Sequence, residues 1–73
     1  MTVEQADHLL RSGRIYESRQ IALTLARGGN SKAARILAIG YLACREYVKA
    51  AFWAGYTNDS ELLRKCESHI GAG

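Results

Sequence analysis

The segment 33–56 would be apolar on every side of a helix. Of its 24 positions, 18 are apolar and two are glycine, and the only charged residues are Arg35, Arg45, Glu46 and Lys49. A helix that is apolar all round is normally central in a large core or inside a membrane. A domain of 73 residues buries only about 60% of the surface of its unfolded chain. We therefore expect another polypeptide to cover one side of this segment.

The composition favours a single all-α domain over residues 1–73. The charges interrupt the apolar segment too often for a membrane span, which needs about 20 consecutive apolar residues. The chain has no proline. Alanine, leucine and arginine dominate, and all three are good helix formers. β-branched residues are few and never alternate with polar ones, so no strand is predicted.

Helix start and stop signals divide the chain into five parts. Thr2 and Gln5 have the spacing of a capping box, and Gly13 is a natural left-handed terminator. A second stop lies at 28–30, after which Ser31 is the expected cap of the next helix, and residues 57–59 form a turn. The break at 45–46 carries neither glycine nor proline. The helices predicted from these signals are about 3–12, 16–27, 32–45, 47–55 and 60–70.

The helices are short enough to pair as αα-hairpins. Tyr16 and Tyr47 follow two of the turns and lie 31 positions apart, close to the period of about 34 of tetratricopeptide repeats. In such a repeat the aromatic residue after the turn wedges between the helices, and a small residue such as Ala50 lets them approach. Gly40 predicts a helix passing close by, since glycine inside a helix costs up to about 1 kcal/mol relative to alanine. We expect two stacked TPR-like hairpins and a C-terminal capping helix. An irregular five-helix bundle is the alternative.

One family shares the order and spacing of these residues. The chain carries Gly13-x-x-Tyr16-Glu17, then Ile21-Ala22-x-x-Leu25, Gly29, Ala33-x-x-Ile36-Leu37, Leu42, Tyr47 and Ala50, and it continues with 58–63, Cys66-Glu67 and Gly71. Over about residues 9–71 this pattern resembles the TPR-like chaperone of the needle subunit of bacterial type III secretion systems. The family's pattern continues with further C-terminal helices, for which residues 1–73 offer no counterpart beyond the expected last helix.

The resemblance implies a cytoplasmic chaperone that masks the self-assembling helix of a needle subunit before export. It also implies a second partner, a small helical co-chaperone, and neither a nucleotide nor a metal. The amino terminus has no basic and apolar stretch of the signal-peptide type, which also favours the cytoplasm.

A groove between stacked hairpins would hold the client helix. The predicted partner-binding residues are apolar or aromatic: Leu37, Tyr41, Phe52, Trp53 and Tyr56. Burial in the core is the alternative for Leu37 and Phe52. Tyr16 and Tyr47 are expected to be structural residues of the corners.

The sequence favours a binding protein over an enzyme, because no set of polar residues has catalytic spacing. Cys66 and His69 lie three positions apart, but two such residues do not make a zinc site, which needs four ligands. No phosphate-binding loop follows the glycines at 28–29. We therefore predict no catalytic residue, no metal and no cofactor. Cys44, within the apolar segment, is expected to be a buried thiol.

A small helical regulator is the rival interpretation. Residues 47–53 loosely match a pattern, tyrosine followed by two alanines and a tryptophan, found in small regulators that act on transcription factors or nucleoid proteins. Residues 11–35 carry six basic side chains and one acid, Glu17. They are spread over several helices, however, and a DNA-reading helix would be polar and exposed. We therefore predict no direct binding of nucleic acid.

Overall fold

The computed structural model describes residues 2–71, all of it helices joined by tight corners. The helices are α1 (Val3–Arg11), α2 (Ile15–Arg27), α3 (Ser31–Ala43), α4 (Tyr47–Tyr56) and α5 (Ser60–Gly71). The expected all-α class is confirmed, and the described residues contain no strand. The predicted breaks are also confirmed, including the one at 45–46 that no glycine or proline marks.

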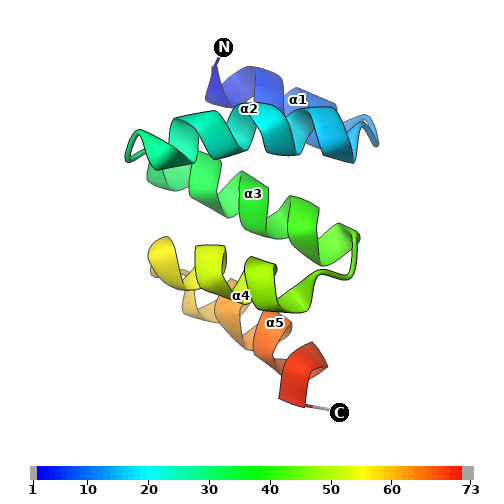
Figure 1. Cartoon of the computed structure of the whole chain (residues 1–73), viewed down its shortest axis with the longest axis vertical. Coiled ribbons are helices and arrows are strands. Elements are labelled where there is room, and N and C mark those ends of the chain that lie inside the picture. The colour runs from blue at the N-terminus through cyan, green and yellow to red at the C-terminus, as the bar shows by residue number, and fades with distance from the viewer. Residues whose placement is uncertain (1, 72–73) are drawn as a thin grey trace.

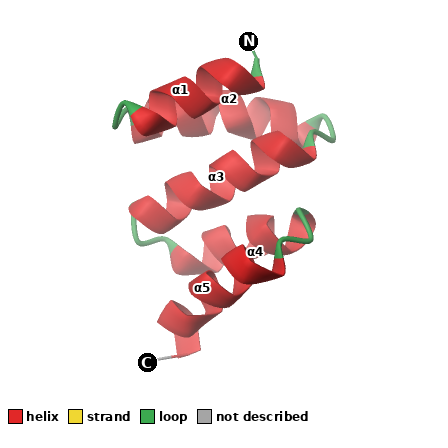
Figure 2. Ribbon diagram, turned by 180° about the vertical axis from the view of Figure 1, so that it is seen from behind, coloured by secondary structure: helices red, strands yellow, loops and turns green. Residues whose placement is uncertain are grey.

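Successive helices run in opposite directions and form two layers (Figures 1 and 2). Each helix packs against the next along the chain, and α1 also packs against α3. In Figure 2 α1, α3 and α5 lie toward the viewer, with α2 and α4 behind them. The helix α3 therefore occupies the centre of the molecule, with α2 and α4 parallel to one another on the same side of it.

Three helices begin with a side chain that caps the backbone. Thr2 and Gln5 form the predicted capping box of α1. Asn30, and not Ser31 as predicted, caps α3, because its side-chain oxygen accepts a hydrogen bond from the backbone N–H of Ala33 at 3.1 Å. Asp59 accepts the backbone N–H of Leu62 at 3.0 Å in the same way. The asparagine and aspartate end their turns and satisfy an amide of the first helical turn.

The corners before α2 and α4 have the same conformation. Gly13 and Arg45 both adopt a left-handed backbone, with φ of 84° and 62°. The amide of the following residue reaches back five positions in each corner, from Arg14 to the Leu9 carbonyl and from Glu46 to the Tyr41 carbonyl, at 2.9 Å in both. These bonds satisfy the last carbonyls of the preceding helix. Arg45 thus takes a glycine-like conformation, which explains why the sequence marks this corner so weakly.

The two corners reveal an internal repeat of 32 residues. Each residue n of α1 and α2 corresponds to residue n + 32 of α3 and α4. Small buried residues then occupy equivalent positions: Ala6 and Ala38, Ser18 and Ala50, and Ala22 and Ala54. The helix α4 is three residues shorter than α2. From α3 to α5 the shift is therefore 29, which pairs the cap Asn30 with Asp59 and buried Leu37 with Cys66.

This repeat corrects the alignment predicted from the two tyrosines. With a shift of 32, Tyr47 corresponds to Ile15 and Tyr16 corresponds to Val48. Tyr16 does not wedge between helices, since 65% of its surface is exposed. Tyr47 is half-buried and stacks on the His69 ring of α5, with ring centroids 4.4 Å apart. The expectation of two equivalent structural tyrosines was wrong.

The core is built largely from alanine. Eight of the twelve buried hydrophobic residues are alanines, and Leu37 is the largest fully buried side chain. Small residues let helix backbones approach closely, so α3 is covered by the neighbouring helices of its own chain. The expectation that another polypeptide covers one side of the apolar segment is therefore not needed for the buried part of α3. It still applies to α4, which keeps large apolar side chains in solvent.

The close crossing of α2 over α3 takes place at Gly40, as predicted. A Cβ atom on Gly40 would lie 2.8 Å from Cγ of Arg19 and 3.7 Å from Cγ2 of Ile15. Gly55 of α4 is different, because nothing lies within 4 Å of the position of its Cβ. Only the first of these helical glycines is required by packing within the described chain.

We predict opposite effects of alanine at the two glycines. Gly55→Ala should stabilise the fold by up to about 1 kcal/mol, because alanine is the better helix former. Gly40→Ala makes the same gain, but overpacking against Arg19 costs about 1–3 kcal/mol. Urea unfolding in dilute solution should therefore rank Gly55→Ala above wild type and Gly40→Ala below Gly55→Ala. Equal gains at both positions would contradict the close crossing at Gly40.

Candidate partner-binding surface

Charged side chains from two helices converge on the ring of Tyr41. The Arg19 guanidinium lies 4.8 Å from the ring centroid and the Lys49 ammonium lies 5.7 Å from it. Both cations are paired with Glu46, at 2.7 Å for Arg19 and 3.3 Å for Lys49. Because Arg19 belongs to α2 and Glu46 directly precedes α4, this cluster ties α2 to α4 across α3.

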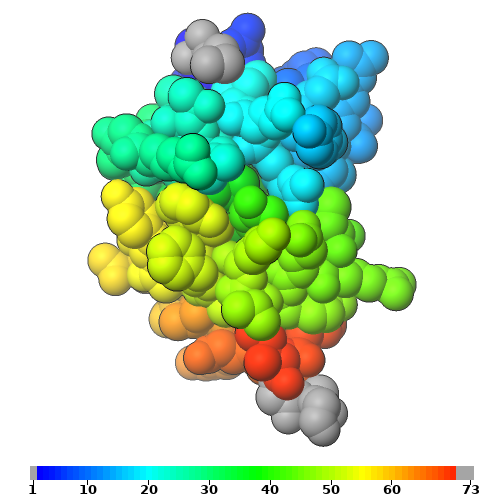
Figure 3. Space-filling model, in the orientation of Figure 1, coloured from blue at the N-terminus to red at the C-terminus, as the bar shows by residue number. Residues whose placement is uncertain are grey.

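Beside this cluster, α4 exposes a group of large apolar side chains. The exposed fractions are 72% for Val48, 67% for Phe52 and 50% for Tyr56. Trp53 is half-buried and meets both aromatic neighbours edge to face, with centroid distances of 5.2 Å to Phe52 and 5.8 Å to Tyr56. In Figure 3 the yellow-green atoms of α4 form the middle of the visible face, below the cyan atoms of α2.

The structure brings four of the five predicted partner-binding residues together. Tyr41 and Trp53 are half-buried, and Phe52 and Tyr56 are exposed. With Lys49 they form a continuous area that we call the aromatic surface: Tyr41, Lys49, Phe52, Trp53 and Tyr56. Leu37 is fully buried in the core of α1, α2 and α3. It offers no surface to a partner, because α3 is central, and we assign it to the core.

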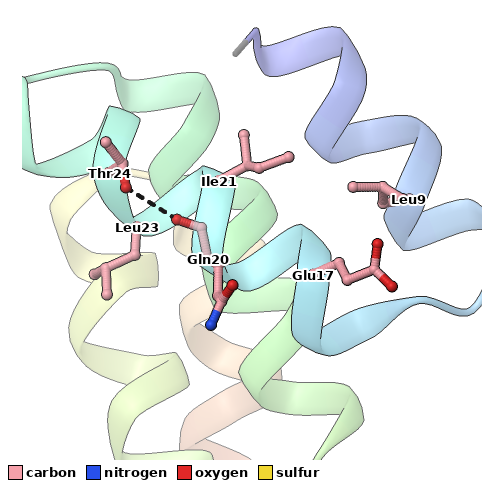
Figure 4. A pocket seen from close by; sticks show the side chains of 6 residues that line it. All are labelled: Leu9, Glu17, Gln20, Ile21, Leu23 and Thr24. Atoms are coloured by element: carbon pink, nitrogen blue, oxygen red, sulfur yellow. Dashed lines mark hydrogen bonds between the residues drawn. The ribbon is translucent and has the colours of Figure 1, made fainter.

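The equivalent face of the first repeat is more polar. A hollow of about 570 Å³ there is lined by Leu9, Glu17, Gln20, Ile21, Leu23 and Thr24 (Figure 4). The Thr24 hydroxyl donates to the backbone carbonyl of Gln20 at 3.1 Å. With the shift of 32, Glu17 is equivalent to Lys49, Gln20 to Phe52 and Thr24 to Tyr56. At the two exposed positions Gln20 and Thr24 the same backbone therefore carries hydrophilic residues on α2 and aromatic residues on α4.

Sequence reasoning missed two exposed apolar residues at the other edge of α4. Val48 is the most exposed of the large apolar side chains, and Ile70 of α5 has 43% of its surface exposed. Both line a hollow of about 430 Å³ at the start of α4. Val48 lies one helical turn before Phe52, and this spacing was the available signal.

The described residues show no centre for metal chemistry. No group of three or more histidine, cysteine, aspartate or glutamate side chains among them is arranged to hold a metal ion. Cys66 is fully buried, and burial raises the pKa of its thiol, which keeps it protonated and unreactive. Cys44 is exposed, not buried as predicted, because α3 ends at Ala43 and Cys44 lies in the corner.

Comparison with protein-family models, curated proteins and solved structures finds no match for this chain. Among the helices of residues 2–71, none is both long enough and apolar enough to span a bilayer.

The ion-pair cluster predicts a loss of stability in acid. Hydrogen bonds from Arg19 and then Lys49 hold the pKa of Glu46 below its ordinary value. A carboxyl whose pKa is lower in the folded state stabilises the fold above its unfolded pKa of about 4.3 and loses that contribution as the pH falls. The urea midpoint should therefore drop between about pH 6 and pH 3, and it should drop less in Glu46→Gln.

Asp59 provides the matched control for this measurement. Its pKa is also lowered, first by the backbone N–H of Leu62 and then by Arg35. Asp59→Asn should therefore remove a separate part of the pH dependence, and the double variant should be flatter than either single variant. Superposable pH profiles for wild type and Glu46→Gln would show that the cluster does not form in solution.

Proposed function

We propose that this chain is a TPR-like binding module that acts as a cytoplasmic chaperone for a self-assembling helical client. By the resemblance in its sequence, the client is a needle subunit of a type III secretion system, and a small helical co-chaperone completes the complex. The observation that carries the proposal is the aromatic surface, where Phe52 and Tyr56 of α4 lie exposed on either side of Trp53. Trp53 itself also packs against both hydrophobic clusters of the core.

The chemistry of the aromatic surface suits an amphipathic helix. Aromatic side chains with partly exposed rings are the commonest anchors in protein interfaces, and a helical partner would present apolar residues at i, i+3, i+4 and i+7. Phe52 and Tyr56 lie one turn apart on α4 and form such a row with Val48. Lys49 has most of its side chain in solvent, so it can meet an acidic side chain at the edge of the client's apolar stripe.

The repeat also supports a TPR-like interpretation of the hairpins. Two equivalent pairs, α1 with α2 and α3 with α4, are followed by α5 as a further half-repeat. Stacked helical pairs of this kind present extended binding surfaces. A client held in this way needs only burial of apolar area, so the proposed activity requires neither a nucleotide nor a metal.

The direct test is co-expression with a needle subunit and its co-chaperone. The chain should form a stable complex with the client and keep it monomeric, whereas the client alone should polymerise. Alone, the chain should bind a hydrophobic dye, and complex formation should abolish that signal, because the aromatic surface becomes covered. Recovery of a transcription factor or a nucleoid protein in place of the client would favour the regulator.

Substitutions on α4 should separate binding from folding. Phe52→Ala or Tyr56→Ala should weaken the client complex by about 2 kcal/mol, roughly thirtyfold in affinity, if the ring is an anchor. Arg11→Ala, remote and exposed, should change the salt dependence of association more than the affinity. Calorimetric titration would give the affinities, and circular dichroism would show whether helix content is retained. A neutral effect of both aromatic variants in folded protein would refute the proposed surface.

Arg19 differs from Arg11 in being largely buried. Only 20% of its side chain is exposed, and it is paired with Glu46. Arg19→Ala should therefore lower the stability of the fold as well as any affinity.

A further inference from the structure

The side of α4 that points away from α2 forms a second surface. It is identified by comparing the two repeats. In the first repeat, a hollow of about 220 Å³ on the side of α2 that faces α4 is lined by Tyr16, Arg19, Gln20, Leu23 and Tyr41. The start of α4 partly covers it, because Glu46 and Lys49 reach Arg19 and Tyr41. The corresponding residues of the second repeat are Val48, Ala51, Phe52, Gly55 and Ile70.

On this second surface Val48, Phe52 and Gly55 are exposed, and Ala51 between them is half-buried. The residues on α4, which we call the α4 stripe, are Val48, Ala51, Phe52 and Gly55. Their spacing of i, i+3, i+4 and i+7 places them on one face of the helix. The α4 stripe carries no charge, and the ion pair that occupies the equivalent position of the first repeat is replaced by alanine at position 51.

We propose that the α4 stripe binds the same stripe of a second copy of this chain, with the two α4 helices antiparallel. A twofold contact requires a surface that is complementary to itself. If the axis passes between Ala51 and Phe52, each residue numbered n faces residue 103 − n of the partner. Phe52 then faces Ala51 of the second copy and Val48 faces Gly55, so that every large side chain meets a small one. The α4 stripe shares Val48 and Phe52 with the row proposed for the client, so the second copy and the client would exclude one another there. The dimer itself is tested without the client.

Size complementarity gives Gly55 a reason to be in the helix. Glycine in a helix is unfavourable, and nothing outside the adjacent residues and the backbone of its own helix lies within 4 Å of the Cβ position of Gly55. In the antiparallel pair, Val48 of the second copy fills that space. The same register brings Tyr56 of the second copy opposite Tyr47. There the hollow beside Val48 and Ile70 can receive its ring.

The charges at the ends of α4 favour the antiparallel orientation. Arg45, at the start of α4, is exposed and makes none of the ion pairs found in residues 2–71. In an antiparallel pair it lies near the C-terminal carbonyls of the other α4, where a cation is stabilised. The two Arg45 residues are then about 20 Å apart along the axis, at 1.5 Å per residue, beyond the screening length of about 8 Å. A parallel pair would place them side by side.

A closed dimer through α4 is also favoured over open stacking of copies end to end. Open stacking would bring the outer surface of α1 against the α4–α5 end. At the positions where α3 has Ile36, Leu37 and Gly40, α1 carries Glu4, Gln5 and His8, all exposed. A polar outer face of this kind closes a repeat array. The isologous dimer continues the layer as α2, α4, then α4 and α2 of the second copy, and it leaves both polar ends free.

The first test is the oligomeric state of the 73-residue chain and two matched variants. Sedimentation equilibrium should show a monomer–dimer equilibrium for wild type. Gly55→Arg should raise the dissociation constant by about a hundredfold or more, because it introduces a charge twice into the apolar contact. Gln20→Arg adds the same charge on the exposed face of α2 and should dimerise as wild type does. Circular dichroism should show all three proteins equally helical, since nothing surrounds Gly55.

Cross-linking tests the orientation. In a Cys44→Ser background, Val48→Cys and Gly55→Cys variants should form a disulfide-linked dimer when mixed, but little when either is oxidised alone. A parallel pair would reverse this result and overturn the proposal. Species larger than a dimer, a wild-type chain that stays monomeric at high micromolar concentration, or a Gly55→Arg variant that dimerises normally would each overturn it as well.

Discussion

The crossing of Arg19 over Gly40 joins the two halves of this protein. The start of α3 belongs to the core shared with α1 and α2, and the rest of α3 belongs to the core shared with α4 and α5. The absence of a Cβ at Gly40 lets the Arg19 stem lie against α3, and the guanidinium then reaches Glu46 and Tyr41. The placement of α4 beside α2 follows from this contact. The aromatic surface depends on it in turn, because Tyr41 lies below Arg19 and next to Lys49.

Because the core is rich in alanine, large apolar side chains remain on the surface of the molecule. Alanine buries little apolar area, and this core contains mostly alanine and few large residues. Burial contributes roughly 25 cal/mol per Å², so the fold relies on close backbone packing and on the exact arrangement of its corners. The large apolar side chains that the core does not use remain in solvent on α4. A fold with this division of residues gains stability when those side chains are covered by binding.

Local signals in the sequence were enough to predict the helices. They were not enough to predict the register of one helix pair relative to the next. The capping residues, the glycine stops and the close approach at Gly40 all followed from single residues and their conformational preferences. The corner at Arg45 shows the limit, since a left-handed arginine leaves no mark in composition, and it places Cys44 outside the core. The two tyrosines suggested a shift of 31, whereas the backbone repeats at 32. With that one-residue difference, Tyr16 is a surface residue and not a wedge between helices. Only tertiary packing decides this register.

The same repeat distinguishes residues that the fold needs from residues that it does not. Ser18 and Ala50 are both small and buried because helices meet at both positions, and Ser18 also donates to the Ala6 carbonyl at 2.7 Å. Gln20 and Phe52 occupy equivalent exposed positions, so the backbone accepts a polar residue there without difficulty. Packing within the described chain therefore gives no reason for phenylalanine at position 52, for valine at 48 or for glycine at 55. Their common explanation lies outside this chain, in a surface that packs against α4.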